Sequence, residues 1–324
     1  QIQGTGQRRS PFSPRNAEIT PHHGALFRVP PSGDTLEIVA TGLRNPNGLA
    51  IGPDDRIAYS DQQGNWVPTS NVQLITEGGF HGFKPTAHGV PIPDEPIDPI
   101  VWLPHGVDNS PGDPIWITGE RWPEALQGQL LQTSYGQATL SLLLIDEGEG
   151  SAQGGLINLP LEFDSGLVRG AFHENGHLYV AGMTSWQSVG DQPGSFHRVR
   201  YTGRSLDLPT GFDVEPGGIR IEFGTALDAA TATDTSRYEL EQWNYRWMRS
   251  YGSPRYSVED PDRQGADAVE VAEARLSRDG RSVFLAIPAI RPVMNVSIDY
   301  RLETAEGAEI DQVIYGTINR VPSE

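Results

Sequence analysis

The chain has 324 residues, no cysteine and a formal net charge of −18, with 24 Lys and Arg against 42 Asp and Glu. This acidic balance argues against a nucleic-acid partner, because neutralising phosphates needs clustered Lys and Arg. The lack of Cys excludes disulfides, thiolate catalysis and Cys-ligated zinc within the chain. The 37 Gly and 26 Pro residues punctuate short strands and helical spacing of apolar residues is missing, so we expect an all-β protein. No apolar stretch approaches the roughly 20 residues of a membrane span.

Residues 1–23 are polar and without periodicity, and they predict an N-terminal arm or a loop between blades. From residue 24 the chain alternates strand, turn and strand. The clearest unit is 48–60, in which an apolar strand, a tight turn at 52–55 and a second strand follow one another. A weakly similar unit returns at 166–181. This unit is typical of a β-propeller blade.

At about 40–45 residues per four-stranded blade, residues 24–204 hold roughly four blades. A closed propeller often has about six or seven, so we expect an incomplete propeller. Either N-terminal blades missing from this chain or a second chain would complete it. Beyond a break near residue 204 the alternation has period two. About seven short strands in 205–324 predict an immunoglobulin- or fibronectin-like β-sandwich.

Three motifs in the first predicted blade carry a resemblance to a known family. They are the turn Gly42–Gly48, the strand end Ser60–Gln62 and the glycine-aromatic segment Gly78–Phe83. Together they resemble the quinoprotein glucose/sorbosone dehydrogenases. Over nearly the whole chain the sequence also resembles the "membrane-bound dehydrogenase domain" proteins of Planctomycetes and their relatives, through Ser60–Val67, Val101–Gly106, Gly128–Leu130, Ser165–Arg169, Gly194–Gly203 and Tyr251–Pro254.

The resemblance implies a bacterial protein, periplasmic or secreted, that oxidises a hydroxyl of a carbohydrate or small polyol. It also implies a PQQ-like quinone and calcium as cofactors. The chain departs from the family pattern in three ways. The catalytic His of the soluble quinoproteins would lie upstream of Gln1, Lys84 is the single Lys available to grip the quinone carboxylates, and Trp66–Ser70 replaces acidic residues that bind a second calcium.

Four residues are predicted to hold the cofactor, namely Arg44, Asn45, Gln62 and Arg169. The fork of an Arg suits carboxylates, and the resemblance places these residues at the propeller channel. Alternatively, Arg44 pairs with an acid near its turn, and Arg169 forms a salt bridge between blades. A metal site is predicted at Asp61, Gln63 and Asn65, because calcium takes carboxylate and amide oxygens. The alternative there is a polar loop whose groups are satisfied within the protein.

His105 ends an apolar strand and precedes a glycine, so it is the predicted general base. The alternative is a structural His that bonds to the backbone. Sugar rings would stack on Trp66, Tyr135 and Trp186, although propeller cores also use aromatic residues.

Two other classes of function stay open. One is a non-catalytic module that binds polysaccharide or protein, and the other is a metal-assisted glycan lyase or hydrolase. If the protein is an enzyme, we expect Arg44, Asp61, His105 and Arg169 to cluster at one mouth of the channel. If it is a binding module, we expect an exposed aromatic platform instead, for instance around Trp243 and Trp247.

Overall fold

The computed structural model describes residues 19–20, 22–88, 92–148 and 150–323, so most of the predicted N-terminal arm lies outside it. Strands make up 44% of the chain, which confirms the all-β prediction. The described helical turns are α1 (Ala229–Ala232) and short 3-10 turns at Pro53–Asp55, Lys84–Thr86, Glu124–Leu126 and Thr235–Arg237. Among the residues described, no helix combines the length and apolar character needed to cross a membrane.

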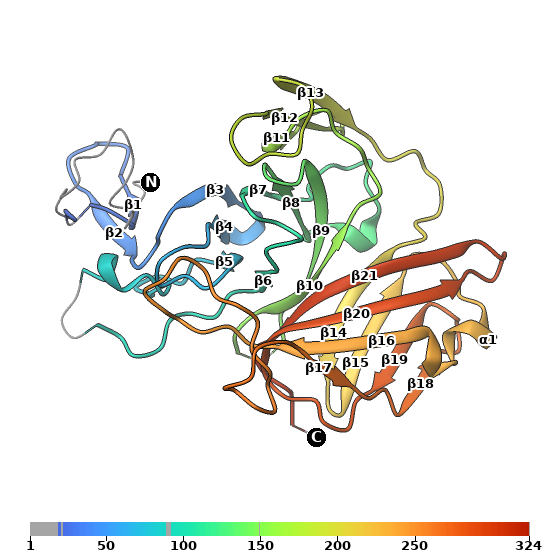
Figure 1. Cartoon of the computed structure of the whole chain (residues 1–324). Helices are drawn as coiled ribbons and strands as arrows, with labels where there is room; N and C mark the ends of the chain where they lie inside the picture. The colour runs from blue at the N-terminus through green and yellow to red at the C-terminus, as the bar shows by residue number, and fades with distance from the viewer. Residues whose placement is uncertain (1–18, 21, 89–91, 149, 324) are drawn as a thin grey trace.

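The first half of the chain folds into antiparallel sheets whose strands follow one another in sequence (Figure 1). A two-stranded sheet pairs β1 (Leu26–Arg28) with β2 (Glu37–Ala40). The next sheet comprises β3 (Pro46–Ile51), β4 (Ile57–Asp61), β5 (Ser70–Leu74) and β6 (Val101–Leu103). The third run comprises β7 (Pro111–Trp116), β8 (Leu130–Ser134), β9 (Thr139–Asp146) and β10 (Gln153–Asn158). A three-stranded sheet of β11 (Leu167–Phe172), β12 (Leu178–Met183) and β13 (Gly194–Val199) follows.

The first strands of these runs lie against one another, β3 beside β7 and β7 beside β11. Glycines make this approach close. A Cβ on Gly48 would lie 2.3 Å from the carbonyl oxygen of Gly112, and one on Gly112 would lie 2.8 Å from that of Leu167. Side chains also cross the seam, since the Ser60 hydroxyl donates to the Gly112 carbonyl. The ends of these adjacent strands are therefore held close together, and the candidate site lies there.

The second half forms two layers that face each other (Figure 1). One layer has the strand order β14 (Pro209–Glu215), β15 (Gly218–Phe223), β19 (Ser282–Ala286), β18 (Glu273–Leu276). The other has the order β17 (Asp267–Val269), β16 (Tyr238–Trp243), β20 (Val293–Glu303), β21 (Glu309–Ile318). Alternate apolar side chains of both layers enter one core, among them Phe212, Ile221, Leu285, Leu240, Ile298 and Ile314.

The two halves share a sheet. Strand β10 pairs with β21 through Gly155 opposite Gly316, so an eight-stranded sheet crosses the domain boundary predicted at residue 205. The ring of Phe212 from the opposite layer packs over this junction. A Cβ added to Gly155 would lie 3.0 Å from that ring, and one on Gly316 would lie 2.8 Å from it. The second half is thus hydrogen-bonded and packed directly onto the first.

Candidate functional site

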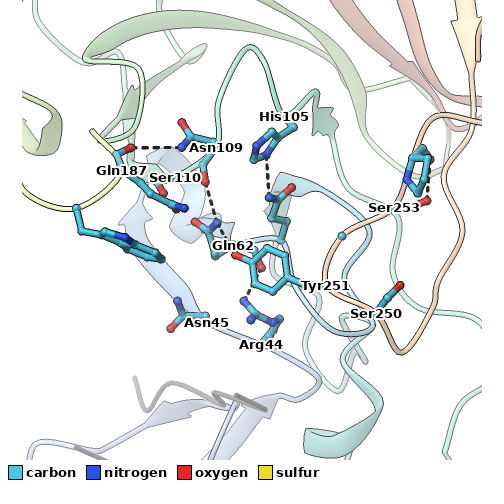
Figure 2. Close-up of a pocket in the computed structure, with 14 residues that line it drawn as sticks. Arg44, Asn45, Gln62, His105, Asn109, Ser110, Gln187, Ser250, Tyr251 and Ser253 are labelled. Carbon is cyan, nitrogen blue, oxygen red and sulfur yellow. Dashed lines mark hydrogen bonds between the residues drawn. The ribbon is translucent and has the colours of Figure 1, made fainter. Parts of the chain in front are cut away.

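An open pocket of about 790 Å³ is lined by residues that connect strands of the first half and by residues 250–254 of the second half (Figure 2). Its lining includes many of the residues predicted from the sequence, namely Arg44, Asn45, Gln62, Gln63, His105 and Trp186. It also includes residues that were not predicted, namely Asn109, Ser110, Gln187 and 250–254. Among the described lining residues there is no Asp or Glu.

Buried Asp61 holds the backbone of three residues that line the pocket. As the last residue of β4, it accepts hydrogen bonds from the backbone N–H groups of Arg44 at 2.7 Å, Asn45 at 2.7 Å and Gln62 at 2.9 Å. Burial raises the pKa of Asp61, and these donors together with the Arg44 charge offset only part of that rise. Both carboxylate oxygens are occupied by backbone donors, so they fix the entry to β3 and do not line the pocket.

Arg44 is a buried cation at the pocket, with 2% of its surface exposed. Its Nη1 donates to the Gln62 carbonyl at 3.1 Å, and its Cζ lies 5.5 Å from the centroid of the Tyr251 ring. Gly64 leaves room for the guanidinium, because a Cβ there would lie 1.9 Å from Cζ. Burial lowers the pKa of Arg44 against the opposing effects of Asp61 and Tyr251.

His105 is exposed at the pocket rim and is oriented by an amide. The Gln63 Nε2 lies 2.8 Å from the ring Nδ1. With the amide nitrogen as donor, Nδ1 accepts, and the hydrogen of the neutral ring is on Nε2. In this arrangement His105 offers the pocket an N–H donor. The general-base role predicted from the sequence needs the Gln63 amide reversed, with its oxygen toward Nδ1.

Amide side chains form one wall of the pocket and are fixed by hydrogen bonds to neighbouring backbone and side-chain oxygens. Gln62 Nε2 donates to the Asn109 carbonyl at 2.8 Å, and Gln137 Nε2 donates to Asn109 Oδ1 at 3.0 Å. Asn45 Oδ1 is buried, and within the described part of the chain it has no hydrogen-bond partner. Such a wall presents several donors and acceptors in fixed directions.

Two aromatic rings flank the amides. Trp186, in the segment after β12, is 80% exposed, and Tyr251 is 50% exposed. The Tyr135 hydroxyl donates to the Trp186 carbonyl at 2.9 Å, so Tyr135 supports this segment without lining the pocket itself.

Tyr251 belongs to a long loop, residues 244–266 between β16 and β17, that docks onto residues 64–68 of the first half. Backbone N–H groups join the two segments, from Trp66 to the Met248 carbonyl at 2.8 Å, from Gly252 to the Gly64 carbonyl at 3.1 Å and from Ser253 to the Pro68 carbonyl at 2.8 Å. The Asn65 amide adds a bond to the Arg249 carbonyl at 2.6 Å. Asn65 and Trp66, predicted as metal and sugar ligands, thus hold the loop in place.

Arg169 lies apart from the pocket lining. Its guanidinium pairs with Asp113 at 3.3 Å and donates to the Asn47 carbonyl at 3.0 Å, which ties β11 to β7 and β3. Among the described residues there is no group of three or more His, Cys, Asp or Glu that could hold a metal ion. The predicted set of Asp61, Gln63 and Asn65 relies on amide oxygens and stays a prediction.

The aromatic platform expected around Trp243 and Trp247 is not present as a surface. Trp243 is fully buried at the end of β16. Trp247 meets Trp102 edge to face, with ring centroids 5.6 Å apart. Among the aromatic residues that follow Trp243 and Trp247 in the chain, Tyr251 lines the pocket. Its segment, Tyr251–Pro254, is one of those that carry the family resemblance, which is the one signal in the sequence that pointed to it.

No protein-family model and no curated protein matches the chain. Among solved structures, it is similar to a chain described as a putative oxidoreductase (glucose dehydrogenase) from Thermus thermophilus, with 22% identity, a TM-score of 0.40 and coverage of 55% of each chain. It is also similar to the PQQ-bound form of aldose sugar dehydrogenase from Streptomyces coelicolor, with 15% identity, a TM-score of 0.40 and coverage of 55% of this chain and 52% of that one.

The chain therefore spans about half the length of these solved structures. Both are described as sugar-oxidising enzymes, the class that the sequence resemblance names. The grouping with Planctomycete proteins remains a prediction. Likenesses at a TM-score of 0.40 say nothing about activity, so the function has to be inferred from the pocket's own side chains.

Proposed function

We propose that this pocket binds a sugar or small polyol. The observation that carries the proposal is the lining itself, in which amides, the Arg44 guanidinium and the His105 ring share one cavity with the exposed rings of Trp186 and Tyr251. Hydroxyl groups need donors and acceptors in fixed directions, which the amide wall supplies. The apolar face of a sugar ring packs on an aromatic side chain.

We further propose that the sheets β3–β6, β7–β10 and β11–β13 are blades of an incomplete β-propeller, within predicted residues 24–204. Their meandering strands and adjacent first strands support this, and missing blades or a second chain would complete the ring. For residues 205–324, the strand orders β14-β15-β19-β18 and β17-β16-β20-β21 support an immunoglobulin-like sandwich. Export to the periplasm or beyond remains a prediction.

Oxidation of the bound sugar is a second candidate function, because His105 lies in the same pocket as Arg44. With the Gln63 amide reversed, its Nε2 would accept a hydroxyl proton. The described lining does not by itself fit PQQ, a planar quinone with several carboxylates. It offers one guanidinium and no lysine, and buried carboxylates left without cationic partners are costly. Oxidation would therefore need groups that this pocket lining does not supply.

Isothermal titration calorimetry of the whole chain with glucose, galactose, xylose and sorbitol tests the binding function. We expect at least one of them to bind, and Tyr251→Ala to weaken that binding about tenfold or more. Phe196→Ala is the matched control, because Phe196 is an aromatic residue on β13 that is 71% exposed and outside the pocket lining. Absence of binding, or equal effects of both substitutions, would contradict the proposal.

A dye-reduction assay with PQQ and calcium added tests oxidation. Sugar-dependent dye reduction that is lost in His105→Gln would support it. A chain that binds sugar yet reduces no dye would limit the function to binding.

A further inference from the structure

Among the described residues no carboxylate forms a direct ion pair with the buried Arg44 guanidinium, and the charge of buried Asp61 acts on it without such a contact. The Arg44 side chain makes one hydrogen bond, to a backbone carbonyl, and its buried Nε has no partner. No ion pair in the described part of the chain includes Arg44. The arginines that do form ion pairs are far more exposed, for example Arg28 and Arg301. A charge taken out of water normally needs a partner of opposite sign.

The protein does not supply that partner from the pocket. No Asp or Glu is among the described lining residues, and the carboxylate whose charge acts on Arg44, that of Asp61, already accepts three backbone N–H bonds. The ring of Tyr251 lies against the Arg44 guanidinium and carries no carboxylate. Among the described lining residues Arg44 is the one Arg or Lys, so an anionic group of a ligand in this pocket would meet a guanidinium and no carboxylate.

We propose that the sugar bound here carries a carboxylate, as a uronic acid unit does, and that Arg44 holds this carboxylate. The inference rests on the proposed sugar-binding function and names its substrate class. A guanidinium fork matches a planar carboxylate through paired N–H donors and is stronger than a bond between neutral groups. The hydroxyls would bind the amide atoms of Asn45 and Gln62 that are not used within the protein, and the sugar ring would pack on Tyr251 and Trp186.

The overall charge of the protein sharpens this inference. A net charge of −18 repels anions at long range, so a preference for an acidic sugar would have to arise from a local contact. A difference in affinity between an acidic sugar and a neutral sugar of the same shape therefore measures the local contact with Arg44.

The test is calorimetric titration of the intact wild-type chain with galacturonate, its neutral methyl ester, galactose and galactose 6-sulfate. We expect galacturonate to bind about tenfold or more tighter than the ester and galactose, because only it offers a carboxylate to the guanidinium. Equal affinities for galacturonate and its ester would overturn the inference while leaving sugar binding intact. Tighter binding of the 6-sulfate than of galacturonate would overturn it as well, and absence of binding by any sugar would contradict the proposed function itself.

Variants then locate the effect. Arg44→Gln is expected to abolish the difference between galacturonate and its ester. Gly64→Ala, which displaces the guanidinium without removing it, is expected to reduce the same difference. Arg198→Gln is the control, because it removes one positive charge from an exposed position on β13 that does not line the pocket. A preference for galacturonate that survives both Arg44→Gln and Gly64→Ala would contradict the role of Arg44.

Discussion

Replacing Asp108 by Asn should make the protein more stable at high pH, and the size of the effect follows from the site. Asp108 lies between β6 and β7, directly before the pocket residues Asn109 and Ser110, and is 4% exposed. Its Oδ1 accepts hydrogen bonds from the Ser134 hydroxyl at 2.7 Å and the Ser110 N–H at 2.9 Å. Burial raises the pKa of Asp108 to about 7, against the smaller opposing effect of these bonds.

The sign of the pH dependence follows from the protons that each state binds. In the unfolded chain an Asp ionises near pH 3.9, whereas folded Asp108 keeps its proton up to about pH 7. Between these values the unfolded state has lost a proton that the folded state retains, so stability falls as pH rises and levels off above pH 7. From pH 5 to pH 8 this amounts to about 2–3 kcal/mol, at about 1.4 kcal/mol per pKa unit.

An asparagine side chain at this position would keep an acceptor oxygen for the two donors and cannot ionise. Urea unfolding of wild type and Asp108→Asn, followed by tryptophan fluorescence at pH 5 and pH 8, measures the difference, since the other titrating groups are common to both proteins. We expect the variant to gain about 2–3 kcal/mol relative to wild type between the two pH values. The same stability difference at both pH values would refute the assignment of a raised pKa to this carboxyl.

Three other predictions concern the pocket and its supporting loop. Gly64→Ala should lower the free energy of unfolding by about 1–3 kcal/mol, because its Cβ would lie 1.9 Å from Arg44 Cζ, and a change below about 0.5 kcal/mol in urea unfolding would contradict the packing described. Asp267→Ala should expose loop 244–266 to proteolysis and weaken sugar binding, because Asp267 accepts bonds from the Ser257 hydroxyl at 2.7 Å and the Val258 N–H at 2.6 Å; unchanged cleavage kinetics would count against this. A bound sugar should change the tryptophan emission of the wild type but not of Trp186→Phe, and a change that persists in the variant would place the ligand elsewhere.

Local patterns in the sequence predicted the local structure well. The expected strand, turn and strand in 48–60 correspond to β3, the 3-10 turn Pro53–Asp55 and β4. The alternation in 218–223 corresponds to β15. In these segments the period of the apolar residues and the turn residues act on neighbouring positions, so a short stretch carries the information.

Contacts between distant segments were not predictable in this way. The pairing of β10 with β21 joins residues about 160 positions apart, and the apolar pattern of each strand fits many partners. This pairing joins strands of both predicted domains in one eight-stranded sheet.

The sequence singled out several residues that line the pocket, namely Arg44 in a turn and Gln62 and His105 after strands. The metal-ligand role of Asp61 stays a prediction. The backbone N–H bonds that its carboxylate accepts could not be predicted, because the order of side chains does not encode them. The docking of loop 244–266 could not be predicted from the sequence either, because most of its bonds to residues 64–68 join backbone groups.

The most direct test of the central claim is a crystal structure of the chain soaked with a sugar that binds in calorimetry. The pocket lining predicts ordered sugar density beside Arg44, in contact with the amide of Gln62 and the rings of Tyr251 and Trp186. Density instead in the separate groove lined by Trp102 and Trp247, with this pocket empty, would contradict the claim.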